Sequence, residues 1–174
     1  INNEKLYMGE RTWVDEKING FERKTLNLII GATGGGKSVW GHHLLRRCIA
    51  QKMHVHIFCV EDREESFLYK FIACQTGIPM RDLKMKYGSL SDKQRKDIAQ
   101  CLDDFDKYVI VDFFYGRGVD EIHQKSLEKD MDRRAKGLPV PIVHIVDYTG
   151  HISSFSSGDK KFEQMRNAYG ARKD

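Results

Sequence analysis

A glycine-rich stretch near the start of the chain constrains the fold more than any other feature. Residues 31–38 read Gly-Ala-Thr-Gly-Gly-Gly-Lys-Ser and match the pattern G-x-x-x-x-G-K-S at every position. In this pattern, glycines let successive backbone N–H groups turn toward a polyphosphate, the lysine reaches the β- and γ-phosphates, and the hydroxyl binds Mg²⁺. The sequence therefore predicts a nucleotide site, with Lys37 also catalytic and Ser38 a Mg²⁺ ligand. The predicted binding residues are Gly31, Ala32, Thr33, Gly34, Gly35, Gly36, Lys37, Ser38 and Val39.

The residues on either side of this loop strengthen the interpretation. The apolar run 26–30 predicts a buried strand, and the residues after the loop recur at helical spacing: Trp40, Leu44, Leu45, Cys48 and Ile49. A glycine-rich turn before Lys-Ser could arise by chance. A strand, a loop and a helix in succession make chance a poor explanation.

The remainder of the chain alternates strands and helices. Further strands are expected at 54–60, 108–111 and 142–146, with helices starting near Asp62, Ser91 and Val119. The expected order is β-α-β-α-α-β-α-β, with one additional short helical turn near residues 78–90. This order predicts an α/β fold, with a mostly parallel sheet, helices on both faces and ligand residues at the carboxyl ends of the strands.

Two aspartates compete for the role of a second Mg²⁺ ligand. Asp147 ends an apolar strand, which is where a metal-binding carboxylate belongs in such a sheet. Asp112 also follows a strand, but Phe113 and Phe114 come after it and place it within an apolar segment or at its edge. Asp147 is therefore the predicted ligand, although a strand-end aspartate can also serve a turn.

Two further carboxylates follow the strand at 54–60. Glu61 at its tip is positioned to accept a proton from a water that attacks the γ-phosphate. Asp62 is its rival, and either residue could instead be a solvated charge or a helix cap. We assign the catalytic base to Glu61 and the N-cap of the next helix to Asp62.

Composition narrows the class of protein. The chain has 174 residues, 40% of them hydrophobic, and a net charge of +4, which suits one globular domain without a dedicated nucleic-acid tail. The 4 cysteines form no zinc-binding pattern and are expected to be small buried side chains in a reducing compartment. No secretory signal or membrane-spanning stretch is visible, so we expect a cytoplasmic protein. The histidines are expected to be structural.

The two ends of the chain differ from its centre. Residues 1–25 form a polar lead-in with Trp13 and Ile18 as expected anchors on the core, Trp13 being a less favoured candidate for base stacking. Residues 26–147 are the expected ATPase core. Residues 148–174 are rich in serine and then basic, which predicts either a mobile loop that contacts DNA or a solvated end. Because residue 1 is Ile, the chain is expected to be a piece of a longer protein.

Several segments together resemble a known family. These are the loop at 31–38, Ile57 to Glu61, Thr76 to Pro79, Gly118 to Ile122, and Ile145 to Tyr148. In this order and spacing they resemble the RecA-like ATPase domain of DnaB-type replicative helicases, especially bacteriophage versions. The likeness covers most of residues 20–150.

The resemblance implies an ATP- and Mg²⁺-dependent motor that forms a ring of six and moves on single-stranded DNA, with 5′–3′ polarity. It suggests primase and a helicase loader as partners, and host cytoplasm as the location for a phage protein. It also implies further strands, a sensor and an arginine finger after Asp147, for which the sequence up to Asp174 offers no candidate. We therefore expect an incomplete motor domain.

Two other functions stay open at this point. A P-loop kinase would need an arginine-rich lid, and residues 148–174 contain Arg166 and Arg172 without a clear lid pattern. A RecA-like nucleotide switch without motor activity has no local feature that separates it from a motor. ATPase assays with and without single-stranded DNA would distinguish the three functions.

Overall fold

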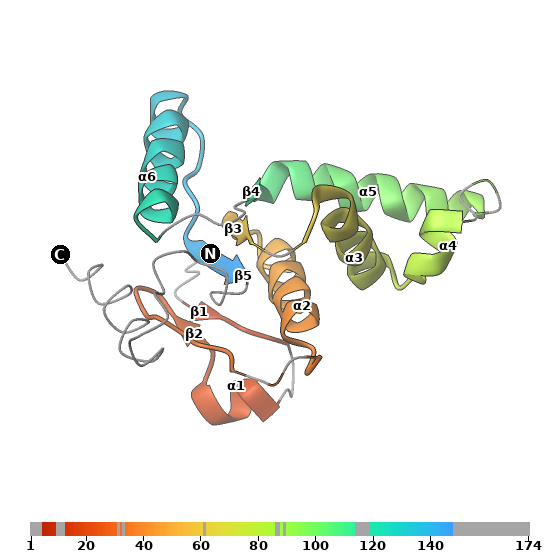
Figure 1. Ribbon diagram of the computed structural model, residues 1–174, viewed down its shortest axis with the longest axis horizontal. Helices are drawn as coiled ribbons and strands as arrows, with labels where there is room; N and C mark the ends of the chain where they lie inside the picture. The colour runs from red at the N-terminus through yellow and green to blue at the C-terminus, as the bar shows by residue number, and fades with distance from the viewer. Residues whose placement is uncertain are drawn as a thin grey trace.

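A small parallel sheet is the centre of the fold (Figure 1). The computed structural model describes residues 5–9, 13–30, 32, 34–60, 62–85, 88, 90–113 and 119–147. The sheet has the order β4-β3-β5, formed by β3 (Val55–Cys59), β4 (Val109–Phe113) and β5 (Val143–Asp147). Val55 pairs with Val109 on one side and with Val143 on the other, so the three strands are parallel and in step. The carboxyl ends of β3 and β5 therefore meet at Cys59 and Asp147.

Helices cover both faces of this sheet, as the sequence predicted. One face carries α2 (Lys37–Ala50), α3 (Glu64–Thr76) and α5 (Asp92–Tyr108), and the other carries α6 (Val119–Ala135). Figure 1 shows α6 on the opposite side of the strands from α3 and α5. The short α4 (Met80–Met85) joins α3 to α5. Within the described residues, no helix combines the length and the apolar character needed to cross a membrane.

The helix ends follow from local sequence. Gly77, in the left-handed region at φ 73°, closes α3. At the start of α5, Ser91 Oγ accepts from the Gln94 backbone N–H at 3.2 Å, and the Ser91 backbone N–H donates to Gln94 Oε1 at 2.9 Å. This is the capping box that the sequence predicted.

The strand predicted at residues 26–30 is absent, and that prediction is wrong. The described sheet therefore has three strands where the sequence predicted four. The apolar side chains of the 26–30 segment are exposed, with Leu26 at 61% and Ile30 at 78%. A strand needs a neighbour for its backbone hydrogen bonds, and no strand pairs with this segment in the described part of the chain.

The N-terminal segment contains structure that the sequence did not predict. Here β1 (Lys5–Leu6) and β2 (Phe21–Glu22) pair antiparallel around α1 (Trp13–Ile18). The expected anchors are wrong, because Trp13 is 72% exposed and Ile18 is 46% exposed. The segment instead enters the main core through three buried side chains: Leu6, Met8 and Val14.

Candidate active site

The glycine-rich loop leads directly into α2. Gly34 lies in a turn, and Gly36 immediately precedes the helix with φ 83°, a left-handed conformation that costs glycine little. The Gly35 backbone N–H donates to the Ala32 carbonyl at 3.0 Å, and a Cβ on Gly35 would lie only 2.9 Å from that oxygen. The loop can therefore curl this tightly only with glycine at position 35. Gly31 and Thr33 lie outside the described residues.

The two polar residues of the motif begin α2. Lys37 Nζ donates to the Ala32 carbonyl oxygen at 2.9 Å, which keeps the ammonium group against the loop. The half-buried Ser38 follows, and Val39 is 69% exposed beside it. The unpaired N–H groups at a helix start carry partial positive charge, so this end of α2 favours an anion.

The fold brings Ser38 and Asp147 together across 109 residues of sequence. Ser38 Oγ donates to Asp147 Oδ1 at 3.5 Å, so the hydroxyl of the loop faces the carboxylate at the end of β5. This contact follows from the topology, because the carboxyl end of β5 and the amino end of α2 lie at the same edge of the sheet.

The chemistry of these two side chains fits Mg²⁺. This ion prefers oxygen ligands, and proteins usually hold it with one or two side chains plus phosphate oxygens and water. Among the described residues, no three His, Cys, Asp or Glu side chains gather into a metal-binding group. The Ser38–Asp147 pair therefore suits an ion shared with a phosphate, and it does not suit a metal enclosed by protein ligands alone.

Asp112, the competing carboxylate, is engaged elsewhere. Its Oδ2 lies 2.8 Å from Nε2 of the fully buried His56 on β3. Burial alone would raise the pKa of Asp112. The hydrogen bond from His56 and the charges of His56, Lys129 and Lys125 outweigh it, so the pKa is lowered. The geometry thus leaves Asp147, and not Asp112, beside the loop.

The expected helix-cap role of Asp62 is wrong. The N-cap residue of α3 is Arg63, and its side chain makes no capping hydrogen bond. Both carboxylate oxygens of Asp62 instead accept from Lys70 Nζ, at 2.6 and 2.7 Å. The sequence carried a weak signal for this pair, since residue 70 lies near the middle of the helix that starts two residues after Asp62. The proposed base, Glu61, lies outside the described residues.

His42 lies one turn after Ser38 on α2 and is almost completely buried against Phe67, with ring centroids 4.8 Å apart. Burial lowers its pKa to about 4, opposed by the nearby Asp62 charge and assisted by that of Lys70. The imidazole is therefore neutral at neutral pH, in agreement with the expected structural role.

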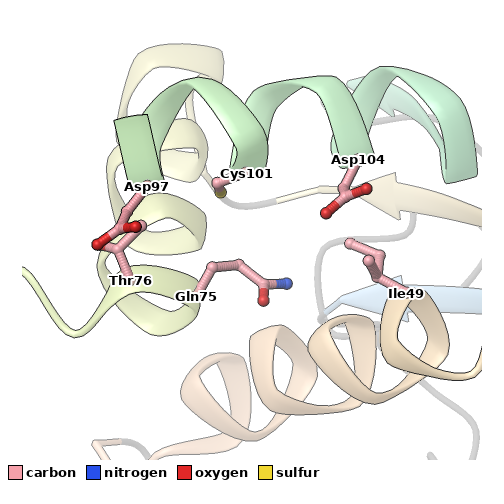
Figure 2. A pocket seen from close by; sticks show the side chains of 6 residues that line it. All are labelled: Ile49, Gln75, Thr76, Asp97, Cys101 and Asp104. Atoms are coloured by element: carbon pink, nitrogen blue, oxygen red, sulfur yellow. The ribbon is translucent and has the colours of Figure 1, made fainter. Parts of the chain in front are cut away.

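A separate cavity lies away from the loop. It has a volume of about 270 Å³, and Figure 2 shows the side chains that line it from α2, α3 and α5: Ile49, Gln75, Thr76, Asp97, Cys101 and Asp104. None of these residues belongs to the glycine-rich loop or to the end of β5. The candidate active site is therefore the open edge at Ser38 and Asp147, and this cavity is not part of it.

Comparisons with known proteins agree with this geometry. The family model described as DnaB-like helicase C terminal domain matches residues 10–168. Similar solved structures include a DnaB-like replicative helicase, studied with its interactions with primase, and the ATPase domain of a bacteriophage protein. Both have a TM-score of 0.61 and 12% identity over 76% of this chain, a likeness that shows the fold. This chain spans 31% and 46% of their respective lengths. No curated protein matches the sequence.

Proposed function

Because this chain belongs to the DnaB-like helicase C-terminal domain family, we propose that it is the ATP-hydrolysing motor of a replicative DNA helicase. The family match supports the expected RecA-like α/β fold and the expected class of enzyme. The DNA substrate, the ring and the roles of single residues belong to this proposal.

One observation carries the proposal, namely the contact between Ser38 Oγ and Asp147 Oδ1 at 3.5 Å. It joins the hydroxyl of a complete phosphate-binding motif to a strand-end carboxylate. A glycine-rich turn without nucleotide chemistry would have no need for this second group. The pairing is the arrangement that P-loop ATPases use to hold Mg²⁺ against a nucleotide.

Each residue then has a chemical role in the proposed reaction. The N–H groups of the loop and of the start of α2 bind the phosphate oxygens, and Lys37 places its charge at the β- and γ-phosphates. Ser38 and Asp147 hold Mg²⁺, which supplies neutralisation of the phosphate charge when it is bound. Glu61 accepts a proton from the attacking water.

The rest of the machine follows by family analogy. We propose a six-membered ring that binds single-stranded DNA and moves 5′–3′, works with primase and a helicase loader, and operates in the cytoplasm of a bacterial cell. Residues 148–174, expected to contact DNA, lie outside the described residues. That assignment and the division at residues 25 and 147 stay predictions.

The test is ATP hydrolysis by the full-length protein with and without single-stranded DNA. We expect stimulation by DNA, loss of nucleotide binding in Lys37→Ala, and retained binding in Glu61→Gln with turnover reduced about a hundred- to ten-thousandfold. Glu64→Gln, an exposed change on α3, is the matched control and should behave as wild type. Tight ATP–Mg²⁺ binding and normal turnover in Lys37→Ala would refute the site. Turnover that requires a small acceptor would favour the kinase, and turnover indifferent to DNA would favour the switch.

A further inference from the structure

The connection between β3 and α3 is held firmly on its β3 side. The backbone N–H of Val60 donates to the Asp147 carbonyl at 3.4 Å, so the ladder between β3 and β5 extends one residue past Cys59. The Val60 side chain is 4% exposed and packs with Phe58, Ile122 and Val146. The residue before position 61 is therefore fixed to the strand that ends in the candidate Mg²⁺ ligand.

The same connection is held on its α3 side by an ion pair. Lys70 Nζ donates to both carboxylate oxygens of Asp62, and the side chains are only 13% exposed for Asp62 and 35% for Lys70. The Asp62 carbonyl also accepts from Cys59 Sγ at 3.5 Å. A bidentate, partly buried, charge-assisted pair holds its geometry better than an exposed pair does.

The base of this ion pair is rigid. Lys70 lies on α3 between Phe67 and Phe71, two side chains that are fully buried in the main core. On the neighbouring α2, His42 packs on Phe67 and stays neutral at neutral pH, because burial lowers its pKa to about 4. His42 therefore brings no second positive charge to Asp62, and Lys70 supplies it.

We propose that Lys70, acting through Asp62, is a positioning residue for the general base at Glu61. The inference rests on the proposed function. Asp62 directly follows Glu61, and Val60 directly precedes it, so the two sets of contacts hold the chain on both sides of the base. Proton transfer depends steeply on such placement, since a shift of about 1 Å can cost about a hundredfold in rate. Lys70 itself touches neither nucleotide nor water in this proposal.

The experiment compares steady-state and single-turnover ATP hydrolysis in the full-length protein, together with ATP–Mg²⁺ affinity. Lys70→Met should lower kcat about ten- to a hundredfold while the nucleotide Kd changes less than about twofold. Lys70→Arg should restore most of kcat, because a guanidinium can also donate to both oxygens. Lys136→Met is the matched control, since Lys136 forms an exposed 2.8 Å pair with Asp132 at the far end of α6.

The outcomes separate this inference from the proposed function. Normal turnover in Lys70→Met, beside an inactive Glu61→Gln protein, would overturn the inference and leave the function standing. Equal losses of affinity and turnover in Lys70→Met, with no recovery in Lys70→Arg, would show a merely structural residue and also overturn it. Normal turnover in Glu61→Gln would overturn both. Only a loss confined to kcat and recovered by Lys70→Arg supports it.

Discussion

The two faces of the central strand β3 are built from different chemistry. Val55, Ile57 and Cys59 point into the main apolar core beneath α2, α3 and α5. On the alternate positions, His56 pairs with Asp112, and Phe58 packs in a small cluster with Ile122 of α6. The whole strand is nevertheless buried, as expected for a central parallel strand.

This difference separates stability from placement. Apolar burial is non-directional and supplies most of the favourable free energy of folding, so the α2 face should dominate stability. Hydrogen bonds are directional and contribute little net free energy. The polar face, with His56 on Asp112 and His144 Nδ1 3.3 Å from Ser126 Oγ of α6, should mainly fix where α6 lies. Because α2 carries the phosphate loop, the stronger face supports the nucleotide site.

The largest effect is expected from Phe71→Ala. The Phe71 ring is fully buried and lies 4.7 Å from the Phe105 ring, so its loss leaves a cavity in the main core. We expect the free energy of unfolding to fall by about 3–5 kcal/mol, measured by urea denaturation. Leu127→Ala, at a 49% exposed site on α6, should cost less than about 0.5 kcal/mol. Equal costs for the two variants would contradict the contrast between the faces.

A second effect concerns pH and the buried His42 on the α2 face. Its folded pKa of about 4 lies below the ordinary value of 6.5. As pH falls between these values, the unfolded state takes up a proton that the folded state does not. Stability therefore declines over this range, by up to about 3 kcal/mol. His42→Leu should remove this part of the decline in denaturation curves recorded from pH 7 to pH 4. An unchanged slope in His42→Leu would exclude His42 as its source.

A smaller effect is expected on the polar face. Asp112→Leu deprives the buried His56 of its partner, and Nδ1 of His56 already has no hydrogen-bond partner among the described residues. The single change should cost about 1–3 kcal/mol. The double variant His56→Leu with Asp112→Leu should recover most of that cost, because no polar group is then left buried and unpaired. A double variant less stable than the single one would show that the pair stabilises the fold outright.

The sequence predicted most of the sheet because its signals are local. Three of the strands and the capping box at Ser91 depend on nearby residues, and the structure has them. The run at 26–30 failed because an apolar pattern cannot specify whether a neighbouring strand will accept it. Asp62 failed for a similar reason, since its partner Lys70 becomes visible only once α3 is folded.

The candidate site was partly predictable by topology. The motif at 31–38 fixed the loop, and the rule that ligand residues lie at carboxyl strand ends favoured Asp147. Its contact with Ser38 follows from that rule. The occupation of Asp112 by His56 could not be predicted, because it depends on the register between β3 and β4. The role of Glu61 stays a prediction.

The most direct test of the Ser38–Asp147 site is nucleotide affinity measured with Mg²⁺ and with a chelator in the full-length protein. We expect Mg²⁺ to tighten binding of a non-hydrolysable ATP analogue at least about tenfold in the wild type, a gain of about 1.4 kcal/mol. Asp147→Asn should lose this gain, and adding Ser38→Ala should lose little more, since both side chains serve one ion. Asp112→Asn should keep it. An Asp147→Asn protein that retains the full Mg²⁺ gain would contradict the account.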